Sequence, residues 1–414
     1  YSDINGGAAR AAYRLHHSLR SIGVDSQMMV NISSSGDCTV HVPGNELIKA
    51  YRRVRSKLVA PIQRLLKTGN PVLHSLNILP SKWPEYLNSS DADVIHLHWI
   101  QGEMLSIYDI ARIRKPIVWT LHDMWACCGS EHDTVDHRWR EGYQTSNRPS
   151  YESGLDLNRW IWLLKKYFWK KPIQIVCPSA WLTICVKHSA LMRSWPVTTI
   201  PNPIDIDSWV PLDQSLARQL LHLPIDRPLL VFGAIGGSKD PRKGFELLLQ
   251  SLHIVKQHDQ FKDLELVIIG ESRPHGVTKF EYPVHYLGHL HDDLSLRAVY
   301  SAADAVLIPS KQDNLPNIGL EAQACGTPVI AYATCGLNDL VQHLHTGYLA
   351  EAFNPTDYAY GIMWAIQAKK QQETSGQIRR HAFNTWGDKM IASSYLQVYK
   401  QCLYSRQTLT HSEA

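Results

Sequence analysis

Short, continuous runs of apolar and β-branched residues recur along the chain, and stretches with helical periodicity lie between them. Continuous runs of this kind are typical of strands that are buried on both faces, as in parallel sheets. Helical stretches such as Gly244–Gln257 separate the runs. The pattern therefore predicts an α/β fold with open parallel sheets. The predicted strands are Val94–His98, Ile117–Leu121, Ile173–Cys177, Leu229–Phe232, Leu264–Ile269, Ala305–Ile308 and Pro328–Tyr332.

A domain boundary is predicted at Ile200-Pro-Asn-Pro-Ile-Asp205, because two prolines stiffen the chain and remove backbone donors there. About 200 residues lie on either side, which favours two similar α/β domains with a cleft between them. We expect domains at residues 1–200 and 201–385, followed by a helical tail at 386–414 that crosses back to the first domain. Ligands of open α/β sheets bind at the carboxyl ends of the strands, so the two crevices are expected to face each other.

The amino-acid composition indicates a folded globular protein and excludes several other classes. The chain has 414 residues, of which 44% are hydrophobic and 19% are charged, and these values exclude a disordered or collagen-like chain. A net charge of +4 does not indicate a nucleic-acid binder. The eight cysteines form no C-x-x-C pair, and no apolar run is long enough to span a membrane, so we expect a cytoplasmic protein with reduced thiols. The chain starts at Tyr1 rather than Met, and we expect its natural first residues to precede this position.

Two segments are suited to bind a phosphorylated ligand. Asn5-Gly6-Gly7-Ala8 precedes a predicted helix, where glycine lets the backbone approach an anion and the helix start offers N–H groups. Arg242 and Lys243 follow the strand Leu229–Phe232 and a loop that contains Gly233, Gly236 and Gly237. Lysine supplies a point charge and arginine a planar fork, which suits a diphosphate. Each segment also has a purely structural interpretation. Asn5–Ala8 would be a simple turn that enters a helix, and the segment with Arg242 and Lys243 would be a basic turn exposed to solvent.

A third segment follows the strand Ala305–Ile308 and carries two carboxylates, Asp313 in a loop and Glu321 in a short helix. Asn317 is predicted to cap that helix. The loop carboxylate is suited to accept hydrogen bonds from sugar hydroxyls, and the helix carboxylate from a ribose diol. The N–H groups at the helix start would then face an anion between them.

This third segment resembles the E-x7-E signature of retaining GT-B glycosyltransferases of family four, and it reads Asp313-x7-Glu321 here. Other segments resemble the family in the same order, and the resemblance covers roughly residues 1–390. They are Asn5-Gly6-Gly7, Trp119-Thr-Leu-His122-Asp123-Met-Trp125, Pro178-Ser179, Ile200–Asp205, and Leu287-Gly288 with Leu296–Ala303. The chain is similar to bacterial exopolysaccharide enzymes, including those of the cyanobacterial heterocyst envelope. It departs from the family at Asp313, where Glu is usual, and at Ala234, where an arginine is usual.

The resemblance implies two Rossmann-like domains facing across a cleft, the first binding the acceptor and the second the nucleotide-sugar. It implies transfer of a hexose, most often from a UDP-sugar, to a glycan or lipid-linked acceptor, with no metal or other cofactor. His122 would contact the reacting sugar, Lys243 would neutralise the diphosphate, and Asp313 would grip the sugar. The implied donor-binding residues are Gly7, Arg242, Gly288, Leu290, Asn314, Leu315, Pro316, Asn317, Ile318 and Glu321.

Three other functions stay open from the residues. A nucleotide-sugar epimerase or a glycoside phosphorylase would share the fold, since a fold by itself does not define a reaction. A glycosidase would use Asp313 and Glu321 as its pair of carboxylates. A non-catalytic sensor would bind the nucleotide-sugar without turning it over.

Two further groups of residues have competing interpretations. The alternation of His96 and His98, with nearby cysteine, histidine and aspartate side chains, raises a metal-site hypothesis against structural roles. The nearby side chains are Cys127, Cys128, His132, Asp133 and His137. The basic segments Lys49–Lys67 and Arg159–Lys171 either dock on an anionic membrane surface or consist of core aromatics with solvated lysines.

Overall fold

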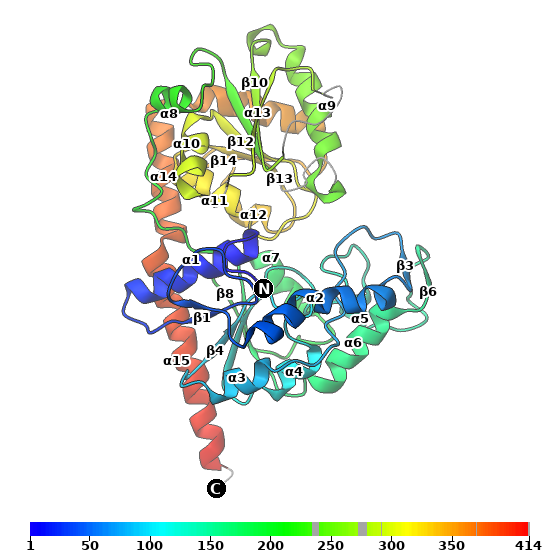
Figure 1. Ribbon diagram of the computed structural model, residues 1–414. Helices are drawn as coiled ribbons and strands as arrows, with labels where there is room; N and C mark the ends of the chain where they lie inside the picture. The colour runs from blue at the N-terminus through cyan, green and yellow to red at the C-terminus, as the bar shows by residue number, and fades with distance from the viewer. Residues whose placement is uncertain (234–239, 272–279, 291, 370, 413–414) are drawn as a thin grey trace. The chain divides into compact units, whose positions relative to one another are not determined.

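The structure is a computed structural model that describes residues 1–233, 240–271, 280–290, 292–369 and 371–412 (Figure 1). Ala234, Gly236 and Gly237 of the predicted glycine-rich loop lie outside the described residues. The chain divides into two compact units, of which the first comprises Tyr1–Pro201 and Lys389–Ala414 and the second Asn202–Asp388. The division between Pro201 and Asn202 falls within the proline-rich segment Ile200–Asp205.

Unit 1 is built on a four-stranded parallel sheet in the order β4-β5-β7-β8. Two smaller pairs accompany it, β1 with β2 in parallel and β3 with β6 in antiparallel orientation. Its strands are β1 (Met28–Met29), β2 (Val40–His41), β3 (Leu66–Thr68), β4 (Ile95–Leu97), β5 (Ile117–Thr120), β6 (Glu152–Gly154), β7 (Gln174–Cys177) and β8 (Val197–Thr199). Its helices are α1 (Gly7–Ser21), α2 (Glu46–Gln63), α3 (Trp83–Ser89), α4 (Ile107–Arg112), α5 (Arg138–Glu141), α6 (Leu157–Phe168), α7 (Ala180–His188) and, from Lys389 onward, α15 (Asp388–Ser412).

Unit 2 is built on a six-stranded parallel sheet in the order β11-β10-β9-β12-β13-β14. Its strands are β9 (Leu229–Gly233), β10 (Glu265–Ile269), β11 (Val284–Gly288), β12 (Ala305–Ile308), β13 (Val329–Tyr332) and β14 (Gly347–Ala350). Its helices are α8 (Gln214–Leu220), α9 (Phe245–Lys256), α10 (Asp293–Ala302), α11 (Asn317–Ala324), α12 (Leu337–Leu340), α13 (Pro355–Lys369) and α14 (Gln372–Trp386), with short 3-10 turns at Pro241–Lys243 and Asp259–Phe261. Counted from β9, the strand order is 3-2-1-4-5-6, the order of dinucleotide-binding folds.

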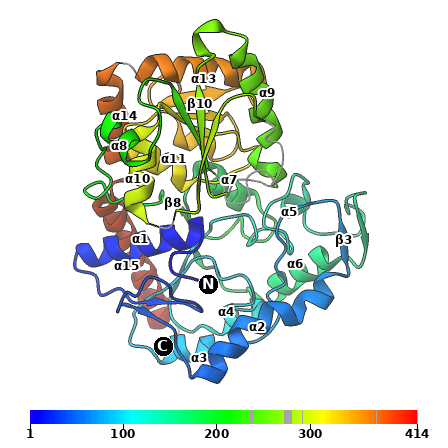
Figure 2. The same ribbon diagram turned by 45° about the horizontal axis from the view of Figure 1, so that its top comes forward.

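The continuous apolar runs of unit 2 are buried on both faces of its sheet. In β9, Leu229 and Val231 join one hydrophobic core, while Leu230 and Phe232 join the other. Helices α10, α11 and α14 cover the first face, and α9 and α13 cover the second (Figure 2). This double covering explains why the predicted strands are continuous rather than alternating in polarity.

The predicted strands are present, with ends that differ by at most one residue from the run that predicted each. Three strands of the two main sheets, β8, β11 and β14, are additional to the prediction. The side chains of β11 are half-buried throughout, and those of β8 are half-buried or exposed. Their sequences lack the uniform apolar character by which the central strands are recognised.

Candidate functional site

An ion pair joins the loops that follow β9 and β12 in unit 2. The Nζ of Lys243 donates to Oδ2 of Asp313 at 2.7 Å. In the strand order, β9 and β12 are the neighbours at which the connections turn from one side of the sheet to the other. Ligands of open α/β sheets bind in the crevice at this switch point. The structure therefore brings the predicted phosphate-binding lysine and the predicted sugar-binding carboxylate together where the fold favours ligand binding.

The position of Lys243 depends on close backbone contact between the two loops. Gly244 has a φ of +66°, and a Cβ atom built on it would lie 1.9 Å from the carbonyl oxygen of Pro309. The backbone N–H of Lys311 donates to the carbonyl of Arg242 at 2.7 Å. Only glycine fits at residue 244, because a side chain would collide with the segment that leaves β12.

Besides Lys243, three residues donate hydrogen bonds to Asp313. Its Oδ2 also accepts from the Ser310 hydroxyl at 3.2 Å, and its Oδ1 accepts from the N–H of Asn314 at 3.1 Å. Its backbone carbonyl accepts from the N–H of Gly336 at 3.1 Å. These contacts fix the carboxylate beside Lys243 before any ligand is present.

Arg242 is oriented differently from Lys243. Its guanidinium pairs with Asp240, with Nη2 to Oδ2 at 2.8 Å and Nε to Oδ1 at 3.1 Å. Its charge is therefore partly met within its own turn, whereas the Nζ of Lys243 reaches Asp313 in the β12 loop.

Helix α11 begins at Asn317, and Pro316 occupies the position before it without a side-chain cap. The prediction that Asn317 caps this helix is wrong, because proline already holds the extended backbone that precedes the helix. The structure instead places Ile318 over the end of β9, where a Cβ on Gly233 would approach its Cδ1 to 2.8 Å. Leu315 is buried, and its carbonyl accepts from the amide of Asn202 at 3.2 Å.

Glu321 lies one turn into α11 and is 3% exposed. Its Oε2 accepts from the Tyr300 hydroxyl of α10 at 2.9 Å. Gly288 ends β11 with a φ of +67°, and Leu290 packs against the core beneath α10 and α11. Of the predicted donor-binding residues, all but Gly7 therefore belong to unit 2.

In unit 1, Gly7 is the first residue of α1 and follows Gly6, whose φ is +96°. His122 lies two residues after β5, where the resemblance places it. Its Nε2 lies 3.1 Å from Nδ1 of His98, and the two rings stack at an interplanar angle of 29°. Asp123 pairs with His132, with Oδ2 2.6 Å from Nδ1.

The predicted group of His96, His98 and the residues around Cys127 does not form a metal centre among the described residues. Within the described residues, one group of three side chains, His16, His17 and Asp37, places potential metal-ligand atoms within 4.8 Å of one another. Both ring nitrogens of His16 already contact hydroxyl groups, Ser26 at 2.8 Å and Thr39 at 2.7 Å. Nε2 of His17 lies 2.9 Å from Oδ2 of Asp37.

Each basic segment combines buried and exposed cations. In α2, Arg52 and Arg55 are buried, and Arg55 donates to the carbonyls of Glu103 and Pro80, each at 2.8 Å. In α6, Lys165 is fully buried and donates to backbone carbonyls of the loop after β5, including Cys128 at 3.0 Å. These cations fasten the helices to unit 1, so neither segment lies wholly on the surface and the lysines are not all solvated.

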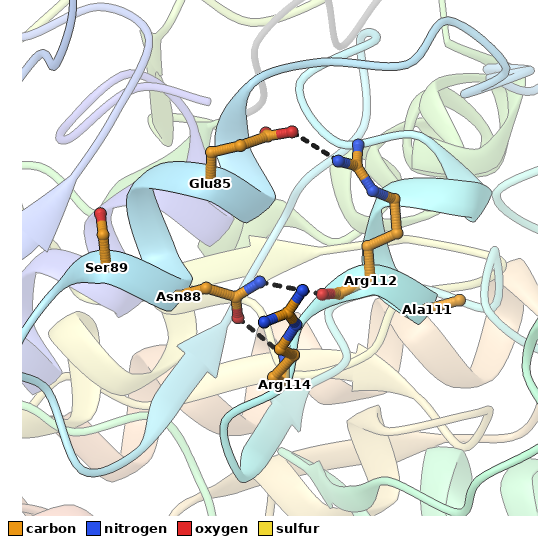
Figure 3. A pocket seen from close by; sticks show the side chains of 6 residues that line it. All are labelled: Glu85, Asn88, Ser89, Ala111, Arg112 and Arg114. Carbon is orange, nitrogen blue, oxygen red and sulfur yellow. Dashed lines mark hydrogen bonds and ion pairs between the residues drawn. The ribbon is translucent and has the colours of Figure 1, made fainter.

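Figure 3 shows a hollow on the surface of unit 1 between α3 and α4. Arg112 pairs with Glu85 across it, and the amide of Asn88 bonds to the backbone of the α4 end. The hollow holds none of the predicted site residues.

We expect acid to destabilise the protein through its buried histidines. Burial lowers the pKa of His122 to about 4, against the opposing charge of Asp123, and burial with the neighbouring His122 lowers the pKa of His96 to about 3. Below its ordinary pKa of 6.5, each histidine binds a proton in the unfolded chain but not in the folded one. The free energy of unfolding should therefore fall by up to about 1.4 kcal/mol per pH unit for each histidine as pH drops from 6.5 toward 4.

Urea denaturation at several pH values in this window measures that slope. His122→Asn removes one titrating ring. The dependence of its unfolding free energy on pH should therefore correspond to the uptake of one proton fewer on unfolding than in the wild type. Equal slopes in the two proteins would show that His122 titrates normally.

Sequence reasoning missed three partners of the site. Tyr300 supports Glu321, Asn202 supports the β12 loop, and His98 contacts His122. The His96-Leu-His98 spacing was the available signal for the last of these. No sequence pattern links Tyr300 to Glu321, since the packing of α10 on α11 brings them together.

Comparison with known proteins identifies the family of the chain. A family model described as "Glycosyltransferase Family 4" matches residues 5–208, and one described as "Glycosyl transferases group 1" matches residues 229–368. D-inositol 3-phosphate glycosyltransferases are similar in sequence. That of Xylanimonas cellulosilytica is 30% identical over 228 residues, covering 51% of this chain and 52% of the relative. That of Geodermatophilus obscurus is 32% identical over 200 residues, covering 44% and 42%. The chain thus spans about half the length of the curated relatives it matches.

Solved structures share the fold. Sucrose-phosphate synthase of Thermosynechococcus elongatus superposes with a TM-score of 0.64 at 19% identity, covering 97% of this chain and 94% of that one. Anabaena HepE in complex with UDP and glucose gives a TM-score of 0.62 at 15% identity, covering 97% and 98%. With its two α/β units, its parallel sheets and both family models, the chain belongs to the group 1, family 4 glycosyltransferases of GT-B fold.

Proposed function

We propose that the protein is a retaining glycosyltransferase that moves a hexose from a UDP-sugar to a glycan or lipid-linked acceptor in polysaccharide biosynthesis. Unit 2 binds the donor and unit 1 the acceptor. The observation that carries the proposal is the Lys243–Asp313 pair at the switch point of the unit 2 sheet. HepE, whose structures are complexes with UDP and glucose and with UDP-glucose, favours uridine as the nucleoside of the donor.

Transfer breaks the bond between the anomeric carbon and the diphosphate oxygen, and the nucleoside diphosphate leaves with the electron pair. Lys243 stabilises the negative charge that develops on this leaving group. Arg242 assists from its turn, and in this proposal the two cations do the electrostatic work without a metal ion. The acceptor oxygen bonds to the anomeric carbon from the leaving-group face, and its proton passes to the departing phosphate. This route retains the anomeric configuration and requires no protein nucleophile.

Asp313 and the backbone of Asn314–Asn317 grip the sugar hydroxyls, while the N–H groups of Ile318 and its neighbours face the diphosphate. Glu321 accepts from the ribose diol, with Tyr300 holding its carboxylate at 2.9 Å. Gly288 and Leu290 lie against the base. From unit 1, Gly7 approaches the donor and His122 contacts the reacting sugar.

Thermal denaturation with UDP, UDP-glucose, ADP-glucose and GDP-mannose tests donor binding. A ligand at about 100 times its Kd stabilises the folded state by about 2.7 kcal/mol, which raises Tm by several degrees. We expect UDP and UDP-glucose to give this rise in the wild type and a smaller one in Glu321→Gln. That variant keeps the bond to Tyr300 but loses the carboxylate charge that strengthens the ribose contact.

Product analysis then separates the reactions. Release of UDP with a new glycosidic bond supports the proposal. An epimerised nucleotide-sugar would identify an epimerase, hydrolysis of a glycoside without nucleotide a glycosidase, and binding without turnover under any acceptor a sensor. Each of these three results contradicts the proposed transfer.

We further propose that unit 1 docks on the anionic cytoplasmic face of a membrane, where a lipid-linked acceptor would lie. Among the described residues, no helix is long and apolar enough to cross a membrane. One face of α2 and the turn after it nevertheless exposes a line of apolar side chains spaced three or four residues apart. They are Leu47 (80% exposed), Tyr51 (48%), Val54 (42%), Leu58 (54%), Ile62 (36%) and Leu65 (48%).

Exposed cations flank this apolar face, namely Arg53, Lys57, Arg64 and Lys67. Such a helix lies in the bilayer interface with its apolar side inserted, and each cation near an anionic surface adds about 1 kcal/mol. The charge of this rim favours an anionic bilayer over a second copy of the same cationic surface.

We expect the full chain to co-sediment with vesicles that contain phosphatidylglycerol and not with pure phosphatidylcholine vesicles. Leu58→Asp removes one inserted side chain and adds a repelled charge, so its partitioning should fall more than about tenfold. Leu216→Asp is the matched control, because Leu216 of α8 is an exposed leucine (48%) in unit 2. Equal binding of the wild type and Leu58→Asp would rule out docking through α2.

A further inference from the structure

Three imidazole rings of unit 1 form a continuous contact series at the carboxyl ends of β4 and β5. The ring centroids of His96 and His98 lie 4.2 Å apart. Those of His98 and His122 lie 5.4 Å apart, with Nδ1 of His98 3.1 Å from Nε2 of His122. The series connects the residue that our proposed function places against the reacting sugar to two histidines of the neighbouring strand.

The far end of the series is anchored by the C-terminal helix. In α15, the Tyr399 hydroxyl lies 2.7 Å from Nδ1 of His96. On the other side of the ring, Nε2 of His96 lies 2.8 Å from Oγ1 of Thr120, which in turn lies 3.0 Å from the Tyr395 hydroxyl. Both nitrogens of His96 are therefore occupied, and its ring cannot turn over without losing two hydrogen bonds.

The helix that supplies these hydroxyls is itself fixed. Ile391, Ala392, Tyr395 and Val398 of α15 are buried in one core with residues of α1, β5 and β7. The packing of α15 therefore fixes the position of Tyr399 independently of the histidines. The hydrogen bond from Tyr399 in turn fixes the position of the His96 ring.

Burial lowers the pKa of all three rings, so they are neutral near pH 7. In a hydrogen bond between two neutral imidazoles, one ring donates and the other accepts. The contact between His98 and His122 therefore couples their tautomers. It also fixes the orientation of the His122 ring, and with it the nitrogen that His122 can present to a sugar hydroxyl.

We propose that His98 is a positioning residue that holds the ring and tautomer of His122, and that α15 stabilises this arrangement through Tyr399 and His96. The functional part of this inference rests on the proposed role of His122, whereas the tautomer part does not. Ordinary core packing would be served equally well by apolar rings, which supply the stacking but not the bond between Nδ1 and Nε2.

Histidine-selective ¹⁵N NMR of the full chain tests the tautomer part without any substrate. The wild type should show a single tautomer for His122. His98→Phe keeps an aromatic ring but removes the nitrogen, so His122 should show a mixture of tautomers. His98→Asn places an amide where Nδ1 lies and should restore the wild-type pattern, while Tyr399→Phe should give a partial change. An unchanged His122 signal in His98→Phe would overturn the proposal.

Release of UDP from UDP-glucose tests the functional part. His98→Phe should lower kcat about tenfold or more with little change in the KM for UDP-glucose, because misorientation of a reacting group costs rate rather than donor binding. His98→Asn should recover most of the lost rate. Tyr143→Phe is the stability control, since this buried tyrosine of unit 1 donates its hydroxyl to Glu131 instead.

A similar fall of kcat in Tyr143→Phe and His98→Phe would attribute the effect to stability and overturn the positioning role. A mixed tautomer in His98→Phe with unchanged kcat would overturn it as well. If the wild type releases no UDP at all, the proposed function fails, and the NMR result alone decides whether His98 holds His122.

Discussion

Lys243→Ala is expected to lower kcat/KM for UDP-glucose by about 10²–10³-fold. The variant removes the cation that lies 2.7 Å from Asp313 at the switch point of the unit 2 sheet. It also leaves the Asp313 carboxylate without its cationic partner, beside the diphosphate that it would then repel. Both changes raise the energy of the charge that develops on the leaving group, so the loss should lie mainly in kcat. Steady-state kinetics of UDP release measures it.

Lys262→Ala is the matched control, because Lys262 is a 59% exposed lysine of unit 2 that pairs with Asp259 at the surface. Lys243→Arg keeps the charge and should recover part of the activity. If Lys243→Ala and Lys262→Ala retain the same activity with intact folding, the electrostatic account of the site is wrong.

Gly244→Ala is expected to destabilise the protein by roughly 3 kcal/mol and to remove most of its activity. The new Cβ would lie 1.9 Å from the Pro309 carbonyl, on a backbone with φ of +66° that L side chains rarely adopt. Relief of this collision requires the two loops to separate, which breaks the bond from Lys311 N–H to the Arg242 carbonyl. Lys243 then moves away from Asp313. Chemical denaturation and the same kinetic assay measure the two losses.

Gly376→Ala provides the contrast within the same unit. A Cβ at Gly376 in α14 meets no atom within 4 Å, and its φ is not positive. Alanine in a helix interior should stabilise the protein by about 0.5–1 kcal/mol and leave activity unchanged. Destabilisation of equal size in both variants would show that the Gly244 contact is not what positions Lys243.

These predictions depend on loop geometry, whereas the fold depends on sheet burial. The run Ala305–Ile308 was predicted with the bounds that the structure has, because four consecutive apolar residues without a turn signal suit a strand covered on both faces. The half-buried residues of β11 offered no such pattern, and neither did the short edge strand β8. A strand that is buried on both faces has a continuous run of apolar residues, which can be recognised in the sequence. A partly buried strand has no such run.

The sequence by itself determined the α/β class and carried the motif Asp313-x7-Glu321, by which it resembles its family. The α/β class follows from the local pattern of apolar residues, and the family follows from the resemblance that the motif carries. Only the tertiary structure decided which side chains meet. Lys243 and Asp313 are 70 residues apart, and His96 and Tyr399 are 303 apart. It also decided that basic residues such as Arg55 and Lys165 are buried on carbonyl groups. Contacts of this kind arise from strand order and helix packing. They cannot be predicted from the residues that neighbour each side chain in the sequence.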